Sequence, residues 1–480
     1  MPAQGRNVVK LNRERTVTTP PATSSAPSGH PDLRPRAALH SLGCRLNHAE
    51  TELIRQRLER AGYRIVPWGE PAEVLVLNSC TVTAEADATS RQALRRARRT
   101  HPAARLAVVG CHAQLHAVAL ANQGLADVIV GNGDKLAVVD HLSAAPAAGA
   151  PAAPRIVLAP LARAAFALEF DPGSLRSEHG GTRAHLKIQD GCDFMCSFCI
   201  IPKARGRARP RSLDNLMAEA EALAERGAKE IVLTGVNLGT FEAQGVALPQ
   251  VVDRLDALPG LARVRIGSIE PTTVDEGLLE RMAAPGHKLA PFLHLPLQSG
   301  SDAILSAMRR RYTAAQYAAF AERALARVPD LCLGADVMAG FPGEDDSAFG
   351  DTFALVSGLP FAYLHVFGYS PRPGTAAARM PGAVPAPIRD RRVAALRTLG
   401  EAKRLAFHRR FLGRQVEVLF EKPRREGLAE GYTERFVRVQ APAPDAAALR
   451  NRILPVRLVE AGPHAAAGEI AAGTADYPVA

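Results

Sequence analysis

Three cysteines on one short segment constrain this chain more than any other feature. Cys192, Cys196 and Cys199 are separated by three and two residues and follow the strand-like run 184–188. Three thiolates on one loop can hold three irons of a cubic 4Fe–4S cluster and leave the fourth iron open to a small chelating molecule. The alternative is a structural zinc loop or three buried thiols, but zinc ligands usually come in pairs from two places.

The length and composition indicate a globular chain of about three domains. A sequence of 480 residues is too long for one core, and 47% hydrophobic with 22% charged residues is typical of folded proteins. No apolar run is long enough to span a bilayer and the start has no signal-peptide core, so we expect a cytoplasmic protein. Its seven cysteines then indicate metal or redox chemistry, or burial, rather than disulfides. The net charge of +11 is compatible with RNA as a partner, although solvated basic surfaces are also common.

A second group of three cysteines follows the strands of a predicted α/β domain. Residues 1–36 are expected to be a disordered arm, whereas residues 37–143 alternate strand-like and helix-like runs, which predicts a parallel sheet with helices on both faces. Cys44, Cys80 and Cys111 each lie one or two residues beyond a predicted strand, and successive βαβ units return the chain to the same sheet edge. The three sulfurs can therefore meet and hold a second cluster. Three unconnected core cysteines are the alternative.

The middle of the chain predicts an open barrel. After an Ala- and Pro-rich linker, residues 144–182, about six strand–helix units follow in residues 183–411. We therefore expect a partial (β/α)6 barrel with its function on the loops after the strands. Several of these loops carry glycines and polar residues, although each motif alone could be an ordinary turn. These loops are residues 234–239, 268–271, 295–301 and 339–344.

The last part, residues 412–475, predicts a small antiparallel β-barrel. Runs at 415–420, 434–439 and 452–459 are strand-like, and a long basic helix precedes them. Residues 391–460 contain 16 Lys or Arg against 8 Asp or Glu, which favours an RNA-binding module because phosphate contacts dominate such affinity. A basic scaffold domain is the alternative. The candidate RNA-binding residues are Arg414, Arg435 and Arg438.

Taken in order, these features resemble the methylthiotransferases of the radical S-adenosylmethionine (SAM) superfamily, from about Ala37 to Val459. The run 191–206 is similar to their cluster loop, and the final domain is similar to their TRAM domain. Within the family the resemblance is greatest to the threonylcarbamoyladenosine tRNA methylthiotransferases. The motifs that carry it are Cys44-Arg45-Leu46-Asn47, Asn78-Ser79-Cys80-Thr81-Val82-Thr83, Ser90-Arg91-Gln92 and Gly110-Cys111-His112-Ala113-Gln114. The sequence departs from the usual family residues at His48, Ser79 and Gly368, none of which is an expected iron ligand.

The resemblance implies a reaction and its cofactors. A methylthio group would be added to C2 of N6-threonylcarbamoyladenosine at position 37 of tRNA, beside the anticodon. Cys192, Cys196 and Cys199 would hold the catalytic 4Fe–4S cluster, which reduces bound SAM to start radical attack at C2. A second 4Fe–4S cluster on Cys44, Cys80 and Cys111 would deliver sulfur, and a second SAM would supply the methyl group. Candidate residues around SAM are Phe198, Gly235, Asn237, Glu270 and Gln298.

The implied partners are tRNA, an electron donor such as flavodoxin or ferredoxin, and a sulfur source, with no membrane. Two related substrates remain open, namely isopentenyladenosine in tRNA and an aspartate of a ribosomal protein. A non-catalytic RNA-binding iron–sulfur protein is an alternative of another class.

Overall fold

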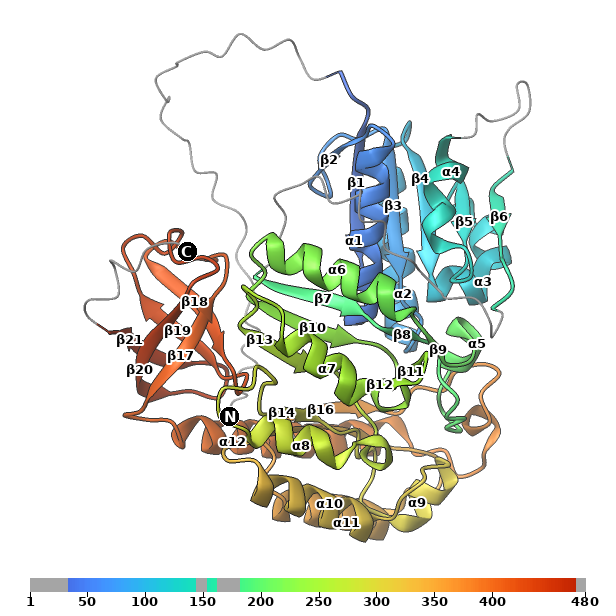
Figure 1. Ribbon diagram of the computed structural model, residues 1–480. Coiled ribbons are helices and arrows are strands. Elements are labelled where there is room, and N and C mark those ends of the chain that lie inside the picture. The colour runs from blue at the N-terminus through green and yellow to red at the C-terminus, as the bar shows by residue number, and fades with distance from the viewer. Residues whose placement is uncertain (1–32, 144–152, 162–181, 472–480) are drawn as a thin grey trace, which may run out of the picture. The chain divides into compact units, whose positions relative to one another are not determined.

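The computed structural model describes residues 33–143, 153–161 and 182–471 (Figure 1). Most of the predicted arm and most of the predicted linker therefore lie outside the described residues, as do the last four residues of the predicted 412–475 domain. Among the described helices, none is long and apolar enough to cross a membrane.

The N-terminal part is a parallel six-stranded sheet in the order β2-β1-β3-β4-β5-β6 (Figure 1). Apolar residues alternate between its two faces: Val74 and Val76 pack under α1 and α4, whereas Leu75 and Leu77 pack under α2 and α3. The predicted parallel sheet with helices on both faces is confirmed. Its elements are β1 Arg36–Ser41, α1 Arg45–Arg60, β2 Arg64–Val66, β3 Val74–Ser79, α2 Ala84–Thr100, β4 Arg105–Gly110, α3 Cys111–Asn122, β5 Val128–Val130, α4 Val138–Ser143 and β6 Arg155–Val157.

Strand β6 corrects the predicted linker. It pairs in parallel with β5, with Ile156 opposite Ile129, inside the segment expected to connect two domains. The run Arg155-Ile156-Val157 contains two β-branched residues, but it is short and surrounded by Ala and Pro. The composition of the whole segment therefore indicated a linker rather than a strand. The first strand also begins at Arg36, one residue inside the predicted arm.

Six parallel strands form the central part, in two three-stranded sheets of order β13-β10-β7 and β14-β15-β16. Isolated bridges between Val264 and Leu289 and between Ser268 and His294 join the two sheets, which confirms the partial (β/α)6 barrel. The barrel elements are β7 Arg183–Lys187, α5 Ile201–Arg205, α6 Leu213–Glu225, β10 Glu230–Thr234, α7 Leu248–Asp256, β13 Arg263–Ile266, α8 Glu276–Ala283, β14 Phe292–His294, α9 Asp302–Ala307, α10 Ala314–Arg327, β15 Cys332–Ala339, α11 Asp346–Gly358, β16 Tyr363–Gly368 and α12 Ala386–Arg409. Two short antiparallel strand pairs lie on its loops, β8 Gln189–Asp190 with β9 Arg209–Pro210, and β11 Glu242–Ala243 with β12 Val246–Ala247.

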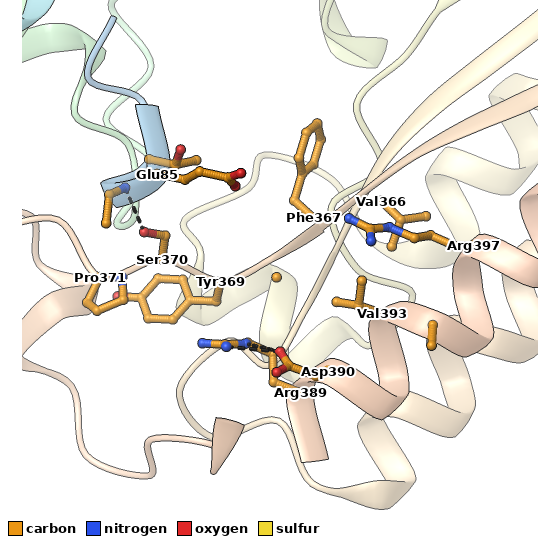
Figure 2. A pocket seen from close by; sticks show the side chains of 14 residues that line it. Glu85, Val366, Phe367, Tyr369, Ser370, Pro371, Arg389, Asp390, Val393 and Arg397 are labelled. Atoms are coloured by element: carbon orange, nitrogen blue, oxygen red, sulfur yellow. Dashed lines mark hydrogen bonds and ion pairs between the residues drawn. The ribbon is translucent and has the colours of Figure 1, made fainter. Parts of the chain in front are cut away.

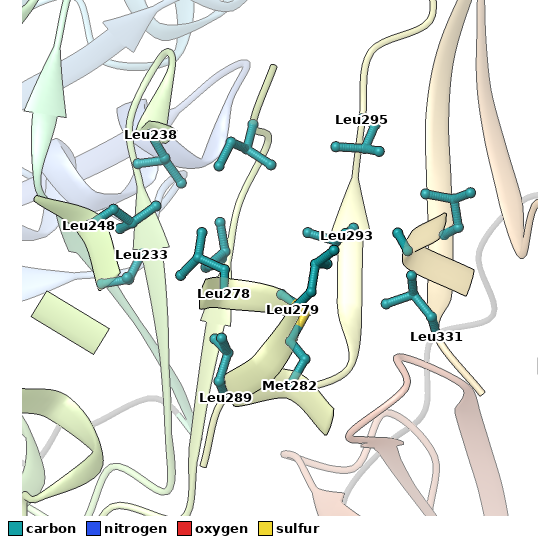
Figure 3. Packing of buried hydrophobic residues seen from close by; sticks show 14 of the residues in the cluster. Leu233, Leu238, Leu248, Leu278, Leu279, Met282, Leu289, Leu293, Leu295 and Leu331 are labelled. Atoms are coloured by element: carbon teal, nitrogen blue, oxygen red, sulfur yellow. The ribbon is translucent and has the colours of Figure 1, made fainter. Parts of the chain in front are cut away.

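The barrel core lies between its strands and the outer helices. Figure 3 shows Leu233 of β10 and Leu293 of β14 beside Leu278 and Leu279 of α8, and all four side chains are fully buried. Successive side chains of a strand point to opposite faces of the sheet. The strand residues directly before and after each of these strand leucines therefore point into the barrel lumen. The polar lumen residues described below follow from this alternation.

The C-terminal part is a closed five-stranded barrel in the order β17-β18-β19-β21-β20. Four of its strand pairs are antiparallel, as predicted, and the β19–β21 pair is parallel. The predicted strand 434–439 is wrong in its first half, because Phe436 has a φ of 59° in the turn between β18 and β19. The strands are β17 Gln415–Phe420, β18 Leu428–Thr433, β19 Arg438–Pro442, β20 Ile453–Ala461 and β21 Ala466–Ile470.

The small barrel shares a hydrophobic core with the central part. Phe407 of α12 and Phe411, just after that helix, pack with Phe292 of β14 and with Val418 and Phe420 of β17. The two parts are therefore joined by a continuous apolar contact.

Candidate active site

The CxxxCxxC loop leaves β8 through a turn that requires glycine. Gly191 has a φ of 69°, and a Cβ there would lie 2.0 Å from the carbonyl oxygen of Arg207. The Phe194 N–H donates to Cys192 Sγ at 3.3 Å. Burial raises the pKa of Cys192 to about 11, and the neighbouring Cys196 thiol adds to the rise.

Cys196 and Cys199 complete a group of three neighbouring thiols. Burial raises the pKa of Cys199 to about 12, and the charges that would form on Cys196 and Cys192 also raise it. A thiolate is therefore unfavourable here without a positive partner, which a bound metal supplies. All seven cysteines of the chain are free. Cys192, Cys196 and Cys199 lie within electrostatic range of one another on one loop, and three thiols are the donor set that a cluster with three protein ligands needs.

Arg310, which the sequence reasoning missed, connects this loop to the loops after β13 and β14, through Glu270 and through the Pro296 carbonyl at 3.3 Å. Its Nη1 lies 3.4 Å from Cys196 Sγ, its Nη2 donates to Glu270 Oε2, and its Nε donates to Tyr312 Oη at 3.1 Å. Burial raises the pKa of Glu270, and the charge of Arg310 opposes that rise. The run of three arginines at 309–311 was the available sequence signal.

Asn237 lies on the same rim and retains an unused donor. Its N–H donates to Gln189 Oε1 at 3.2 Å, and its Oδ1 accepts from Thr273 Oγ1 at 3.2 Å. Its Nδ2 is buried and has no hydrogen-bond partner among the described residues. A buried donor without a partner is unfavourable, so this amide is available to a ligand.

The remaining candidate SAM-binding residues, Gly235, Gln298 and Phe198, carry no charge and contribute through backbone conformation and packing. A Cβ on Gly235 would lie 2.7 Å from the Leu238 side chain, so the loop is closely packed. Gln298 has a φ of 68°, and its N–H donates to the carbonyl of Asp336 at 2.8 Å. Phe198 is partly buried against the cluster that contains Met308.

Cys44, Cys80 and Cys111 of the second group follow the carboxyl ends of β1, β3 and β4. Burial raises the pKa of Cys80 to about 11, and the neighbouring Cys111 and Cys44 also raise it. Asn132 Nδ2 lies 3.4 Å from Cys111 Sγ, and a Cβ on Gly43 would lie 2.6 Å from Cys80 Sγ. Three free thiols from three strand ends, within electrostatic range of one another, fit a second site with three protein ligands.

A buried ionic network lies beside this second group and joins two domains. Arg205 Nη1 lies 2.8 Å from Glu50 Oε1, and Lys187 Nζ lies 2.8 Å from the same oxygen. Glu50 also pairs with Lys135, and Asp190 pairs with both Lys187 and Arg205. The five side chains are at most 4% exposed and carry three positive and two negative charges. The charge of Arg205 also lowers the pKa of Cys80, so the excess positive charge acts on the cysteine group.

A second buried contact joins the N-terminal part to the segment after β16. Arg372 Nη2 donates to Asp87 Oδ2 at 2.5 Å and to Thr81 Oγ1 at 2.8 Å. His112 Nδ1 lies 2.8 Å from Asp87 Oδ1. Burial raises the pKa of Asp87, but bonds from His112, Thr81 and Arg372 outweigh it and lower the pKa to about 2. These residues flank Cys80 and Cys111 and hold their loops against the barrel.

Three strands of the barrel place a His–Asp–His group in the lumen. His294 Nε2 of β14 lies 3.0 Å from Asp336 Oδ1 of β15, and His365 Nδ1 of β16 lies 3.3 Å from the same oxygen. Tyr363 Oη lies 2.9 Å from His294 Nδ1. Burial raises the pKa of Asp336, but bonds from the two histidines lower it well below its usual range. Sequence reasoning missed this group, although the three residues occupy lumen positions of adjacent strands.

The predicted RNA-binding arginines all have carboxylate partners. Arg414 Nη1 lies 2.9 Å from Asp330, Arg438 Nη2 lies 2.8 Å from Glu430, and Arg435 pairs with Glu434. The Arg414 side chain is 49% exposed and the Arg438 side chain 30% exposed, so both remain accessible.

A cavity of about 720 Å³ lies where α2 meets β16 and α12. Figure 2 shows Phe367 of β16 and Arg397 of α12 on its wall, with Glu85 of α2 and Ser370 on the other side. The Ala84 N–H donates to Ser370 Oγ at 3.2 Å, which closes this side of the cavity. Its walls therefore belong to both the N-terminal and the central part.

Two family models match the chain. A model described as uncharacterized protein family UPF0004 matches residues 36–131, and a model of the radical SAM superfamily matches residues 186–356. The first match contains Cys44, Cys80 and Cys111, and the second contains the CxxxCxxC loop.

Named relatives match over most of the chain. Threonylcarbamoyladenosine tRNA methylthiotransferase MtaB of Bacillus subtilis (strain 168) is 33% identical over 432 residues, covering 88% of this chain and 94% of that protein. The protein of the same name from Aquifex aeolicus (strain VF5) is 34% identical over 400 residues, covering 83% of this chain and 96% of that protein.

Among solved structures, the radical S-adenosylmethionine methyltransferase TsrM from Kitasatospora setae, with cobalamin and a [4Fe-4S] cluster bound, matches with a TM-score of 0.53. The identity is 16%, over 72% of this chain and 77% of that chain. At this identity the likeness concerns the fold.

Proposed function

The chain belongs to the radical SAM methylthiotransferase family, and from that premise we propose that it adds a methylthio group to C2 of N6-threonylcarbamoyladenosine beside the anticodon of tRNA. The observation that carries the proposal is the occurrence of two free cysteine triplets on a chain whose named relatives are tRNA methylthiotransferases. One triplet lies on a single loop, and the other is gathered from three strand ends.

We propose that each triplet holds one 4Fe–4S cluster with an iron open to a small ligand, and that SAM binds at the cluster on Cys192, Cys196 and Cys199. When bound, this cluster supplies the electron that cleaves SAM, the second cluster supplies sulfur, and a second SAM supplies the methyl group. Burial raises the pKa of Cys80, Cys192 and Cys199, and this supports both sites because a bound metal would favour the thiolate form of these buried side chains.

The surrounding side chains suit this chemistry. Arg310 donates toward Cys196 Sγ and fixes the Glu270 carboxylate, so a cation stands beside the first thiol group. Arg205 and the buried network around Glu50 place excess positive charge beside the second. The unused Nδ2 of Asn237 offers a donor to SAM on the rim. Positive groups beside an anionic cluster stabilise it and raise its reduction potential.

The C-terminal barrel is proposed to bind tRNA through Arg414, Arg435 and Arg438. The exposure of Arg414 and Arg438 supports this role, because RNA phosphates can bind their guanidinium groups in place of the present carboxylate partners or together with them. An electron donor such as flavodoxin or ferredoxin, and a sulfur source that rebuilds the second cluster, are further requirements of the proposed reaction.

The test is mass spectrometry of tRNA nucleosides from cells that lack the protein. We expect 2-methylthio-N6-threonylcarbamoyladenosine to disappear and its precursor to accumulate, with recovery by the unaltered gene and no recovery by Cys196→Ala. Loss of a methylthio isopentenyladenosine instead would assign the other tRNA substrate. An unchanged tRNA profile would reject the proposal and direct attention to methylthiolation of a ribosomal aspartate.

A further inference from the structure

Three arginines from two domains surround the ring of Phe436. The guanidinium carbons of Arg45, Arg183 and Arg265 lie 5.8, 5.4 and 5.1 Å from its centroid. Arg45 comes from the start of α1, Arg183 and Arg265 come from the barrel, and Phe436 comes from the C-terminal barrel. Positive charge is therefore concentrated where three parts of the chain meet.

Two of these cations form direct ion pairs, whereas the third, Arg45, interacts with Glu230 only at longer range. Arg183 Nε donates to Glu421 Oε1 at 2.7 Å, and Arg265 Nε donates to Glu230 Oε1 at 2.7 Å. The Arg45 guanidinium has no hydrogen bond or ion pair with any side chain in the described ranges 33–143, 153–161 and 182–471, although it is only partly exposed. Removing a charge from water without a partner is costly, so an anionic group that binds Arg45 would be strongly favoured.

The neighbours of Arg45 place it close to the proposed sulfur-donating cluster and to the barrel lumen. Arg45 follows Cys44 directly, so it is adjacent in the chain to a proposed ligand of the sulfur-donating cluster. Its charge acts on His185 and Tyr363, which both occupy lumen positions of the barrel. Tyr363 and Phe436 also line a cavity of about 350 Å³ together with His365 and Arg438. Arg45 reaches this cavity through Phe436, which lines it and whose ring centroid lies 5.8 Å from the Arg45 guanidinium carbon.

We propose that Arg45 binds the free carboxylate of the threonyl group of N6-threonylcarbamoyladenosine, an inference that rests on the proposed function. The threonine is joined through its amine, so its carboxylate stays ionised, and an arginine can bind a carboxylate with two parallel hydrogen bonds. C6, which carries the substituent, is separated from C2 by a single ring nitrogen. The carboxylate arm therefore leaves the ring near the carbon that must reach the second cluster, and a residue adjacent to Cys44 is suitably placed.

This assignment makes Arg45 a specificity-determining residue. An isopentenyl group at the same nitrogen has no anion, and binding it would leave the Arg45 charge without a partner. The competing explanation is structural: Arg45 could serve only to hold α1 against Phe436 by a cation–π contact. A structural role would affect all substrates equally, whereas carboxylate recognition would not.

The experiment uses the anaerobically reconstituted full chain and two synthetic anticodon stem-loops, one with threonylcarbamoyladenosine and one with its methyl ester. Binding is measured by fluorescence anisotropy, and product is measured by mass spectrometry. We expect the unaltered protein to bind the free acid about 10- to 100-fold more tightly than the ester, the range that one charge-assisted contact provides. Arg45→Gln should bind both RNAs with the affinity of the ester, and Arg45→Lys should keep part of the preference.

Arg254→Gln, on the exposed surface of α7, is the matched control and should keep the full preference. The iron content of Arg45→Gln is measured alongside, so that loss of a cluster is distinguished from loss of carboxylate recognition. Equal affinity of the unaltered protein for acid and ester would overturn the role of Arg45 without requiring any variant to fold. The role would also be overturned if Arg45→Gln weakened binding of the acid and of the ester by the same factor and lowered the melting temperature, because a structural role affects both RNAs alike. Absence of methylthio product from the free-acid RNA would instead overturn the proposed function itself.

Discussion

Arg205 and Glu50 form a fully buried ion pair between the barrel and the N-terminal α/β domain, with Arg205 Nη1 at 2.8 Å from Glu50 Oε1 and both side chains 1% exposed. Lys135 and Lys187 approach the same carboxylate, and the three cations hold the pKa of Glu50 well below its usual range despite its burial. One carboxylate therefore pairs with cations from both domains.

Glu50→Gln should destabilise the protein by about 3–5 kcal/mol, because it leaves buried cations without their shared anion. Urea unfolding at neutral pH measures the change. Glu280→Gln is the control: Glu280 pairs with Arg327 at 2.7 Å on the surface, where such pairs contribute less than about 1 kcal/mol. Equal effects of the two substitutions would contradict the role assigned to the buried network.

The two cysteine triplets predict the iron content. Anaerobic reconstitution should give about eight irons per chain, and Cys44→Ala should leave about four. Cys332→Ser is the matched control, since Cys332 is 2% exposed in the apolar core shared with the C-terminal barrel and should leave iron content unchanged. About four irons that are insensitive to Cys44→Ala would defeat the two-cluster proposal.

How far the sequence could predict this site depends on how local each feature is. The spacing of Cys192, Cys196 and Cys199 is a property of one loop, and the strand-end placement of Cys44 and its partners follows from βαβ periodicity, so both were predictable. The Glu50–Lys187 contact joins residues 137 positions apart, and no sequence period reports such a pairing. This contact forms only because the barrel packs against the N-terminal domain.

Local conformation explains the remaining differences. Phe436 lies in an alternating run that indicates a strand, yet the chain turns there with a left-handed residue to begin β19. The same turn brings Phe436 to Arg45 and Arg265, so the region that sequence patterns predicted least well contains the proposed specificity site. Arg310 was missed for another reason: its importance comes from partners on three separate loops, Cys196, Glu270 and the Pro296 carbonyl.

Arg310→Gln should make the reduction potential of the cluster on Cys192, Cys196 and Cys199 more negative. Removing a cation and a hydrogen bond beside Cys196 Sγ disfavours the added electron. A contact worth about 1 kcal/mol corresponds to about 40 mV for a one-electron couple. Redox titration followed by electron paramagnetic resonance measures the shift, and the neighbouring exposed Arg309→Gln serves as control. A positive shift, or an equal shift in both variants, would refute the contact.

His185 predicts a stability change in mildly acidic solution. Burial, with the charges of Arg45 and Arg183, lowers the pKa of His185 to about 4. Because the unfolded imidazole binds a proton near pH 6.5, the unfolded state gains protons first as the pH falls. Stability is therefore full above about pH 6.5 and falls toward pH 4, by about 3 kcal/mol for this one group.

His185→Gln should remove that part of the pH dependence, which urea unfolding at pH 7, 5.5 and 4 can measure as a difference from the unaltered protein. Arg45→Gln removes one of the charges that oppose protonation of His185, so it should flatten the same slope partly. Identical slopes in all three proteins would show that His185 does not titrate in this way.

Arg438 tests the proposed tRNA contact of the C-terminal barrel. Removing the whole barrel would expose the core that it shares with α12, so a single substitution is the cleaner experiment. Arg438→Gln should weaken tRNA binding and reduce the slope of log affinity against log salt by about 1, because one phosphate contact and its released counterion are lost. SAM cleavage should stay unchanged. Arg254→Gln on α7 is the control.

If Arg438→Gln lowers the melting temperature but leaves tRNA affinity and its salt slope intact, the pair with Glu430 is only structural, and the basic barrel is a scaffold rather than an RNA-binding module.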